Sequence, residues 1–255
     1  IAELRANVSL PFERAHAMPK SVYTSPAFAK AEEEHIFAQE WLCAGRADAL
    51  GKPGDYLTMN VAGEPVIILR DREGQLRGMS NVCRHRMSTL LEGRGNVRSI
   101  VCPYHAWTYN LDGSLRGAPA MARNEDFCRE DIKLPPVRVE DWQGWIMVTR
   151  NPDEAAVAER LAGVDRLVGH LPMAQYREVF REEFRWDTNW KVLAENFMES
   201  YHLPVCHSGT IGGSSDLNKM ECPAGEEAFN YHWIVKNDQV PLALAHPSNT
   251  VLQGD

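Results

Sequence analysis

Two short segments of the chain each pair a cysteine with a histidine. Cys83 and His85 are separated by one residue, and Cys102 and His105 by two. Thiolates and imidazoles are the side chains that bind zinc and iron most readily in proteins. Each pair stands beside strand-like sequence, so we expect each at the tip of a loop. Two such tips facing each other would bring two thiolates and two imidazoles to one metal centre.

Three interpretations of these residues are open. They could be ordinary buried side chains, although metal-binding residue types seldom pair twice at such tight spacing. They could form a zinc site with two cysteines and two histidines, but such sites usually group like residues, whereas each pair here is mixed. They could hold a [2Fe–2S] cluster in which two histidines replace two cysteines on one iron.

A second group of metal-binding residue types lies about a hundred residues further on. Glu199 and His202 are three residues apart, and His207 follows just beyond Pro204. Apolar residues at helical spacing precede them, so we expect a helix over 189–203 that Pro204 disrupts or ends. Glu199 and His202 would then share one face of this helix. The group is either a solvated Glu–His edge or part of a site in which two histidines and a carboxylate bind iron.

The elements expected to position these groups differ along the chain. Between residues 41 and 150, short strand-like runs alternate with turn signals, which is typical of a small antiparallel sandwich. We expect strands over 65–69 and 145–148, and a hairpin at Asp112-Gly113. An amphipathic helix is expected over 153–171, followed by a strand over 184–186.

The N-terminal residues carry weaker signals. Pro11 and Pro19 predict an irregular segment over 1–24. Ser25 and Pro26 resemble an N-cap and a first helical residue, which predicts a helix extending to about residue 39. We therefore divide the chain into an N-terminal helical segment over 1–40, a β domain over 41–150 and a second domain over 151–255.

Composition excludes several classes of function. The net charge of −8 disfavours nucleic acids and anionic membranes as partners. No apolar run approaches the roughly 20 residues that cross a bilayer. The 6 cysteines are too sparse for a disulfide scaffold, which favours a reducing, cytoplasmic setting.

The residues around the first group resemble the Rieske proteins. The run Cys102-Pro-Tyr-His-Ala-Trp-Thr-Tyr109 resembles their second cluster loop, and Cys83-Arg-His-Arg86 resembles the first loop of Rieske oxygenases. The resemblance implies a Rieske [2Fe–2S] cluster bound by Cys83, His85, Cys102 and His105. Ser88 and Tyr104 stand where respiratory Rieske proteins carry a disulfide, which implies a low potential. Met87 and Ala106 stand where many relatives have glycine.

The second group resembles the catalytic domain of Rieske non-haem iron oxygenase α subunits. The resemblance rests on Asn189-Trp-Lys191, Glu195-Asn196 and the spacing of Glu199, His202 and His207. It implies that His202 and His207 bind a mononuclear Fe(II). Glu199 would then link an iron ligand to His105 or His85 of a neighbouring subunit, which implies a homotrimer. The implied fold is α+β, with a Rieske domain followed by a helix-grip catalytic domain. We expect that domain to be incomplete here, with the carboxylate ligand of iron outside the chain.

The resemblance also implies an activity. Glutamate at the bridging position is typical of oxygenases that demethylate or cleave quaternary ammonium compounds such as carnitine, glycine betaine and proline betaine. Such an enzyme uses dioxygen and NAD(P)H electrons delivered by a flavin and iron–sulfur reductase to hydroxylate a C–H bond of a small substrate. Two alternatives remain: an aromatic-ring hydroxylating dioxygenase, and a Rieske electron-transfer protein without oxygenase activity.

Overall fold

The computed structural model describes residues 2–210, 217–221, 223, 225–226 and 228–234. The chain divides into two compact units. The β unit is built from Ala29–Arg160 and Pro172–Glu182, and the helix unit from Ile1–Phe28, Leu161–Leu171 and Glu183–Asp255. The three-part division that we drew from the sequence stays a prediction.

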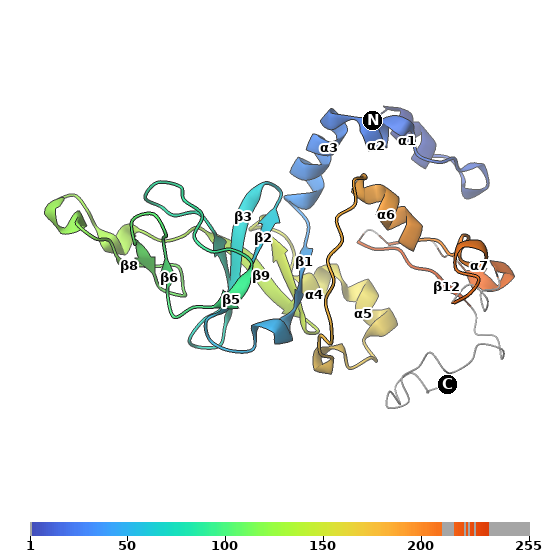
Figure 1. Ribbon diagram of the computed structural model, residues 1–255. Helices are drawn as coiled ribbons and strands as arrows, with labels where there is room; N and C mark the ends of the chain where they lie inside the picture. The colour runs from blue at the N-terminus through green and yellow to red at the C-terminus, as the bar shows by residue number, and fades with distance from the viewer. Residues whose placement is uncertain (1, 211–216, 222, 224, 227, 235–255) are drawn as a thin grey trace. The chain divides into compact units, whose positions relative to one another are not determined.

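The β unit contains two antiparallel sheets (Figure 1). The larger sheet has seven strands in the order β1-β10-β9-β4-β3-β2-β5. These strands are β1 Leu42–Arg46, β2 Asp55–Val61, β3 Glu64–Arg70, β4 Leu76–Ser80, β5 Arg94–Asn96, β9 Pro136–Trp142 and β10 Trp145–Thr149. The smaller sheet consists of β6 Ile100–Val101, β7 Thr108–Tyr109 and β8 Leu115–Gly117. The predicted antiparallel fold is confirmed, as are the strands over 65–69 and 145–148 and the hairpin between β7 and β8.

Strand β3 lies between two hydrophobic cores. Ile67 and Leu69 pack with residues near the cysteine-bearing loops, whereas Val66 and Ile68 pack with Ile146 and other residues on the opposite face. Successive side chains of a strand point to opposite faces, so a run of four apolar residues supplies both cores. All four are 0% exposed, which explains why this strand is apolar without a break.

Two polar side chains fix local features of the β unit. Asp71, in the turn between β3 and β4, accepts hydrogen bonds from the backbone N–H groups of Glu73 and Gln75 and from Arg77 Nε at 2.7 Å. Arg46 Nη2 donates to the carbonyl oxygens of Met173 and Tyr176, each at 2.9 Å. Arg46 thus fastens the segment Pro172–Glu182 to the sheet.

The N-terminal residues are more helical than predicted. Instead of an irregular segment, the chain forms α1 Ala2–Val8 and α2 Lys20–Thr24. Pro19 is the N-cap residue of α2, and a proline in that place does not interrupt helical hydrogen bonds. The helix predicted from Pro26 is confirmed as α3 Pro26–Glu32, which continues into a π-helical turn over Glu33–Phe37. Ser25 Oγ accepts the Phe28 N–H at 3.4 Å, as expected of an N-cap.

The helix predicted over 153–171 is broken. It forms α4 Val157–Arg160 and α5 Ala162–Val168, because Leu161 between them leaves the helical conformation with φ −102° and ψ 17°. The strand predicted over 184–186 is wrong. These residues form no strand, and Phe184 and Trp186 are exposed, without a paired strand in the part of the chain that the structure describes.

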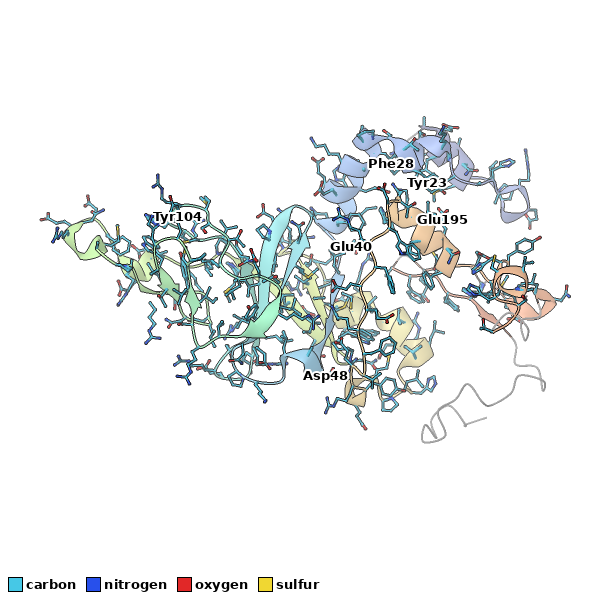
Figure 2. All side chains as sticks on the ribbon, in the orientation of Figure 1. Tyr23, Phe28, Glu40, Asp48, Tyr104 and Glu195 are labelled. Carbon is cyan, nitrogen blue, oxygen red and sulfur yellow. The ribbon has the colours of Figure 1, made fainter. Side chains whose placement is uncertain are left out.

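The helix unit contains the second group of metal-binding residue types. Its remaining elements are α6 Trp190–Phe197, α7 Leu203–Cys206, β11 Met220–Glu221 and β12 Trp233–Ile234. Asn189 caps α6 by accepting the Lys191 N–H, and Tyr23 of α2 donates to both oxygens of Glu195 in α6 at 2.8 and 2.9 Å (Figure 2). Helices α2 and α6 are therefore joined by side-chain contacts. None of the described helices is both long enough and apolar enough to cross a bilayer.

Candidate metal centres

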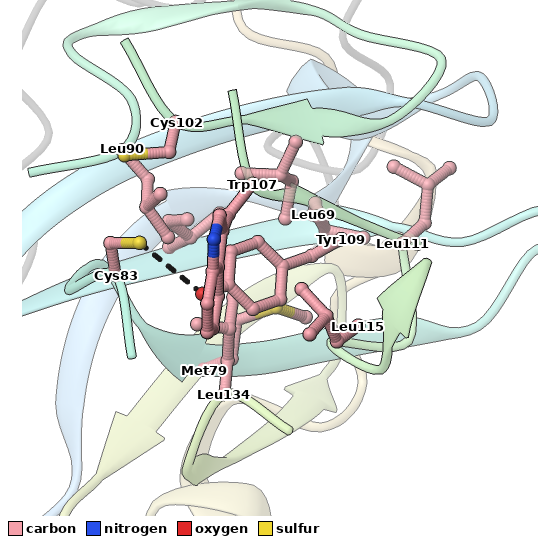
Figure 3. Packing of buried hydrophobic residues seen from close by; sticks show 12 residues of the cluster. Leu69, Met79, Cys83, Leu90, Cys102, Trp107, Tyr109, Leu111, Leu115 and Leu134 are labelled. Atoms are coloured by element: carbon pink, nitrogen blue, oxygen red, sulfur yellow. Dashed lines mark hydrogen bonds between the residues drawn. The ribbon is translucent and has the colours of Figure 1, made fainter. Parts of the chain in front are cut away.

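Both cysteine–histidine pairs lie in loops, as the sequence predicts. Cys83 and His85 follow β4, and Cys102 and His105 lie between β6 and β7. The two cysteines are 0% and 2% exposed and belong to one hydrophobic core, which Figure 3 shows from close by. His85 is exposed and His105 is half-buried, so the imidazoles mark the outer side of this site.

The two loops share one backbone pattern. In each, the cysteine carbonyl accepts the N–H of the residue four places on, which is Met87 at 3.1 Å in the first loop and Ala106 at 3.0 Å in the second. Met87 and Ala106 have φ of 56° and 57°, in the left-handed region where glycine is favoured. A glycine at either position would adopt this conformation without the steric cost that a side chain carries. The loops differ in where the histidine stands, two residues after Cys83 but three after Cys102.

The histidines of the two loops come together. The rings of His85 and His105 lie edge to face with centroids 4.6 Å apart. His85 also stacks on Trp107, with centroids 4.7 Å apart and an angle of 8° between the rings. The buried Trp107 therefore orients the exposed histidine.

His105 has the features of a metal ligand. Its Nδ1 atom is buried and has no hydrogen-bond partner among the residues that the structure describes. A buried nitrogen without a partner is costly unless it binds a metal or water. Burial, helped by the nearby charges of His85 and Arg86, lowers the pKa of His105 and favours the neutral ring that binds metals.

The environment of Cys102 favours a thiolate. Burial alone would raise the pKa of the Cys102 thiol. Hydrogen bonds from the backbone N–H groups of Tyr104 and His105 outweigh burial, so this pKa lies below its ordinary value. Near Cys83, burial and the hydrogen bond to the sulfur both raise the pKa of Tyr109, so that phenol stays protonated.

A zinc ion and a two-iron cluster place different demands on these four side chains. Within the described residues, no three His, Cys, Asp or Glu side chains converge on a single ion position. Tetrahedral zinc would require four ligands around one point. A Rieske-type [2Fe–2S] cluster instead takes two cysteines on one iron and two histidines on the other, so its ligands need not converge.

The second group is placed differently from our prediction. Helix α6 ends at Phe197, and Pro204 lies in the first turn of α7 instead of ending a longer helix. Glu199 and His202 therefore lie in the turn between the helices and not on a helix face. The Glu199 carboxylate accepts the backbone N–H groups of Tyr201 and His202, and these bonds replace helical ones.

Glu199 also orients His202. Its Oε1 atom is hydrogen-bonded to His202 Nδ1, which leaves Nε2 of that ring for a metal. Although burial opposes it, the hydrogen bond with His202 lowers the pKa of Glu199, which keeps the carboxylate charged. The rings of His202 and His207 have centroids 5.4 Å apart, so both can face one ion. No carboxylate in the described part of the chain completes this site, and the expectation of a third ligand outside the chain stays a prediction.

One residue of the first site escaped the sequence analysis. The hydroxyl of Tyr109 lies 3.3 Å from Cys83 Sγ and accepts the Arg84 N–H at 3.0 Å. Its position two residues after Trp107, at the end of a short strand-like run, was the available signal.

Known proteins share both parts of this chain. A family model described as the Rieske [2Fe-2S] domain matches residues 40–142, and one described as the catalytic domain of the ring hydroxylating alpha subunit matches residues 173–250.

Individual relatives are oxygenase components. The carnitine monooxygenase oxygenase subunit of Acinetobacter baumannii is 36% identical over 204 residues, which are 76% of this chain and 53% of that protein. The glycine betaine monooxygenase oxygenase subunit of Chromohalobacter salexigens is 31% identical over 237 residues, which are 90% of this chain and 53% of that protein. A solved quaternary ammonium Rieske monooxygenase in complex with L-carnitine has a TM-score of 0.76 at 35% identity, covering 82% of this chain and 60% of that one.

The chain spans about half the length of the curated relatives it matches. Both of its domains nevertheless match their parts of one architecture, an N-terminal β Rieske domain and a partial catalytic domain, which confirms the predicted α+β class. The chain belongs to the Rieske non-haem iron oxygenase α subunits, whose cofactors are a Rieske [2Fe–2S] cluster and a mononuclear iron.

Proposed function

We propose that this chain is the oxygenase component of a two-component enzyme that hydroxylates a C–H bond next to the nitrogen of a quaternary ammonium compound. The sequence similarity to oxygenase subunits named for carnitine and glycine betaine supports this substrate class. The observation that carries the proposal is the hydrogen bond between Glu199 and His202. This bond orients the imidazole for iron, and its acceptor is a glutamate, the residue type at the bridging position of the oxygenases that this chain resembles.

We assign the ligands as the sequence suggests. Cys83, His85, Cys102 and His105 hold the [2Fe–2S] cluster, and His202 and His207 hold the mononuclear iron. The cluster supplies electrons one at a time, and the iron supplies the position at which dioxygen reacts. Three observations support this assignment: the buried thiols, the His105 Nδ1 atom that has no partner among the described residues, and the bond from Glu199 to His202 Nδ1, which does not involve Nε2. The helix-grip fold of the second domain is part of the same proposal.

The role of Glu199 in a homotrimer follows from its remaining hydrogen-bond capacity. A carboxylate has about four lone-pair positions, and three are used by Tyr201 N–H, His202 N–H and His202 Nδ1. The fourth can accept an N–H from a cluster histidine of a neighbouring copy. His85 and the adjacent Tyr104 and Met87 are exposed in this chain, which supports burial of this surface by another subunit.

The proposed reaction balances with electrons from a reductase. One substrate, one dioxygen, two electrons and two protons give the hydroxylated substrate and one water. If the hydroxylated carbon is an N-methyl group, the product loses formaldehyde and a proton and leaves a tertiary amine. NAD(P)H supplies the electrons through a flavin and iron–sulfur reductase. The free cysteines of the described chain support a reducing, cytoplasmic setting.

The test is dioxygen uptake by the purified protein with a reductase and NADH across carnitine, glycine betaine and proline betaine. We expect uptake with at least one of them, and formaldehyde where an N-methyl group is attacked. Formation of a cis-diol from an arene would instead identify a ring dioxygenase. An iron content of two per chain without uptake would indicate an electron carrier, whereas about three supports an oxygenase.

A variant separates the bridge from the cluster. Glu199→Ala removes the contact with His202 but lies in a different segment from all four proposed cluster ligands. We expect its visible spectrum to match the wild type while its turnover is lost. Full turnover in this variant would contradict the proposed role of Glu199.

A further inference from the structure

A buried hydroxyl lies in the turn that carries the proposed iron ligands. Ser200 directly follows Glu199, is 3% exposed, and has its Oγ atom 3.1 Å from His232 Nε2. A buried hydroxyl without a partner is costly, so this hydrogen bond stabilises the position of Ser200. The two residues are 32 places apart in the chain, so the bond joins the turn to a distant segment.

A second contact runs beside the first. Asn230 Nδ2 lies 3.6 Å from Met198 Sδ. Asn230 precedes His232 by two residues, and Met198 likewise precedes Ser200 by two. The segment over 228–232, which we call the strap, therefore follows the turn in the same direction.

The other end of the strap is held by α5. Just before the strap, Glu226 accepts hydrogen bonds on both carboxylate oxygens from Arg166 Nη2, at 3.0 and 3.2 Å. The strap approaches α5 so closely that a Cβ atom on Gly163 would lie 2.5 Å from Phe229 Cε1. All of these residues belong to the helix unit, so within that unit the strap links α5 to the turn.

We propose that the strap positions the mononuclear iron site, and that His232 does so by holding Ser200 and with it the turn that carries His202. The proposal rests on the proposed function, in particular on His202 as an iron ligand. Backbone rotation at Ser200 would change the angle between the side chains on either side of it. The bond to His232 limits that rotation and so preserves the contact of Glu199 with His202. His232 is thus a positioning residue, which acts through Ser200 and not on the substrate.

Ser200 is linked to the second proposed ligand as well. Its carbonyl oxygen accepts the Leu203 N–H at 3.2 Å, at the start of α7. His207 directly follows the last residue of that helix. A movement of Ser200 would therefore be transmitted to both histidines, whose ring centroids are 5.4 Å apart.

The test is the Fe(II) affinity of the mononuclear site in the purified protein, from an anaerobic titration against a competing chelator. His232→Phe keeps a ring and removes the nitrogen that Ser200 contacts, and Ser200→Ala removes the hydroxyl. We expect about a fivefold weaker affinity in each, which corresponds to about 1 kcal/mol, the usual net contribution of one hydrogen bond. Because both variants remove the same bond, the double variant should bind no more weakly than either single variant.

A spectroscopic measurement separates positioning from general stability. Nitric oxide bound to the mononuclear Fe(II) gives an electron paramagnetic resonance signal whose symmetry depends on the arrangement of the ligands. We expect a changed signal in His232→Phe. We expect the wild-type signal and affinity in His232→Gln, because the amide nitrogen of glutamine takes nearly the place of histidine Nε2. His170→Phe is the matched control, since it removes an exposed imidazole just beyond α5, and it should match the wild type.

The outcomes distinguish the strap from the ligand assignment. Wild-type affinity and signal in His232→Phe and Ser200→Ala would overturn the role of the strap, as would additive losses in the double variant or an equal loss in His170→Phe. If His232→Phe does not fold, the decision falls to the other two variants: Ser200→Ala must lose affinity and His232→Gln must keep it. Wild-type protein that binds no iron beyond its cluster would refute the assignment of His202 and His207, and the proposal with it.

Discussion

Replacing Glu199 tests whether a carboxylate holds His202 ready for iron. The carboxylate divides its bonds between two oxygens: Oε1 pairs with His202 Nδ1, and Oε2 accepts the backbone N–H groups of Tyr201 and His202. An amide has one acceptor oxygen, so Glu199→Gln cannot satisfy both sets of donors. Either the imidazole or the backbone pair loses its acceptor, and Glu199→Ala removes all three bonds.

The expected magnitude follows from the number of bonds lost. Loss of a group that orients a metal-binding histidine typically costs 10–100-fold in metal affinity. We expect about a tenfold loss for Glu199→Gln and about a hundredfold loss for Glu199→Ala, or roughly 1.4 and 2.7 kcal/mol. The loss expected for Glu199→Gln lies at the lower end of this range because the carboxamide retains one acceptor oxygen.

The assay is an anaerobic titration of the mononuclear site with Fe(II) after selective removal of that iron, using a chelator competition to obtain Kd. Glu195→Gln is the matched control, because it makes the same charge change four residues earlier, where the partner is Tyr23 and not a histidine. We expect its Kd to equal that of the wild type. Wild-type affinity in Glu199→Ala would refute the reasoning, and so would an equal loss in the control.

Three further predictions concern stability, measured by denaturant unfolding. Ala106→Gly should stabilise the protein by roughly 1 kcal/mol, because it relieves a left-handed conformation; no gain would contradict this. Tyr23→Phe should cost about 1–2 kcal/mol through its lost bonds to Glu195, and an unchanged midpoint would argue against it. Hydrogen bonds from Arg77 and from the turn N–H groups outweigh burial and lower the pKa of Asp71. The contribution of Asp71 to the free energy of unfolding is therefore complete above about pH 4, and it is lost as the pH falls through the lowered pKa. The difference between wild type and Asp71→Asn should therefore vanish on acidification, and a constant difference would refute the assignment.

The sequence predicts local chemistry well at both sites. Side-chain type and spacing are sufficient to predict that each mixed Cys–His pair lies close together. Two residues of one short loop are neighbours regardless of how the rest of the chain folds. The same holds for the contact between Glu199 and His202, which are three residues apart. Strand β3 was also predictable, since its four consecutive apolar residues require burial on both faces.

The predictions of secondary structure were wrong where contacts of a particular side chain, or the lack of a neighbouring strand among the described residues, outweighed the periodic pattern of apolar residues. Apolar spacing predicted one helix over 189–203, but the Glu199 carboxylate takes backbone N–H groups that a continuous helix would use. The segment over 184–186 has the composition of a strand but no neighbouring strand among the described residues. Pro19 was interpreted as a breaker, whereas it precedes the first turn of α2.

The sequence by itself determined which atoms are available to bind metal and which strands must be buried on both faces. Only the tertiary structure decided which other groups reach those atoms. Tyr109 is 26 residues from Cys83 along the chain, and Arg46 is more than a hundred residues from the segment that it fastens. Such contacts depend on strand register and chain closure, because side chains far apart in sequence meet only when the backbone between them has folded.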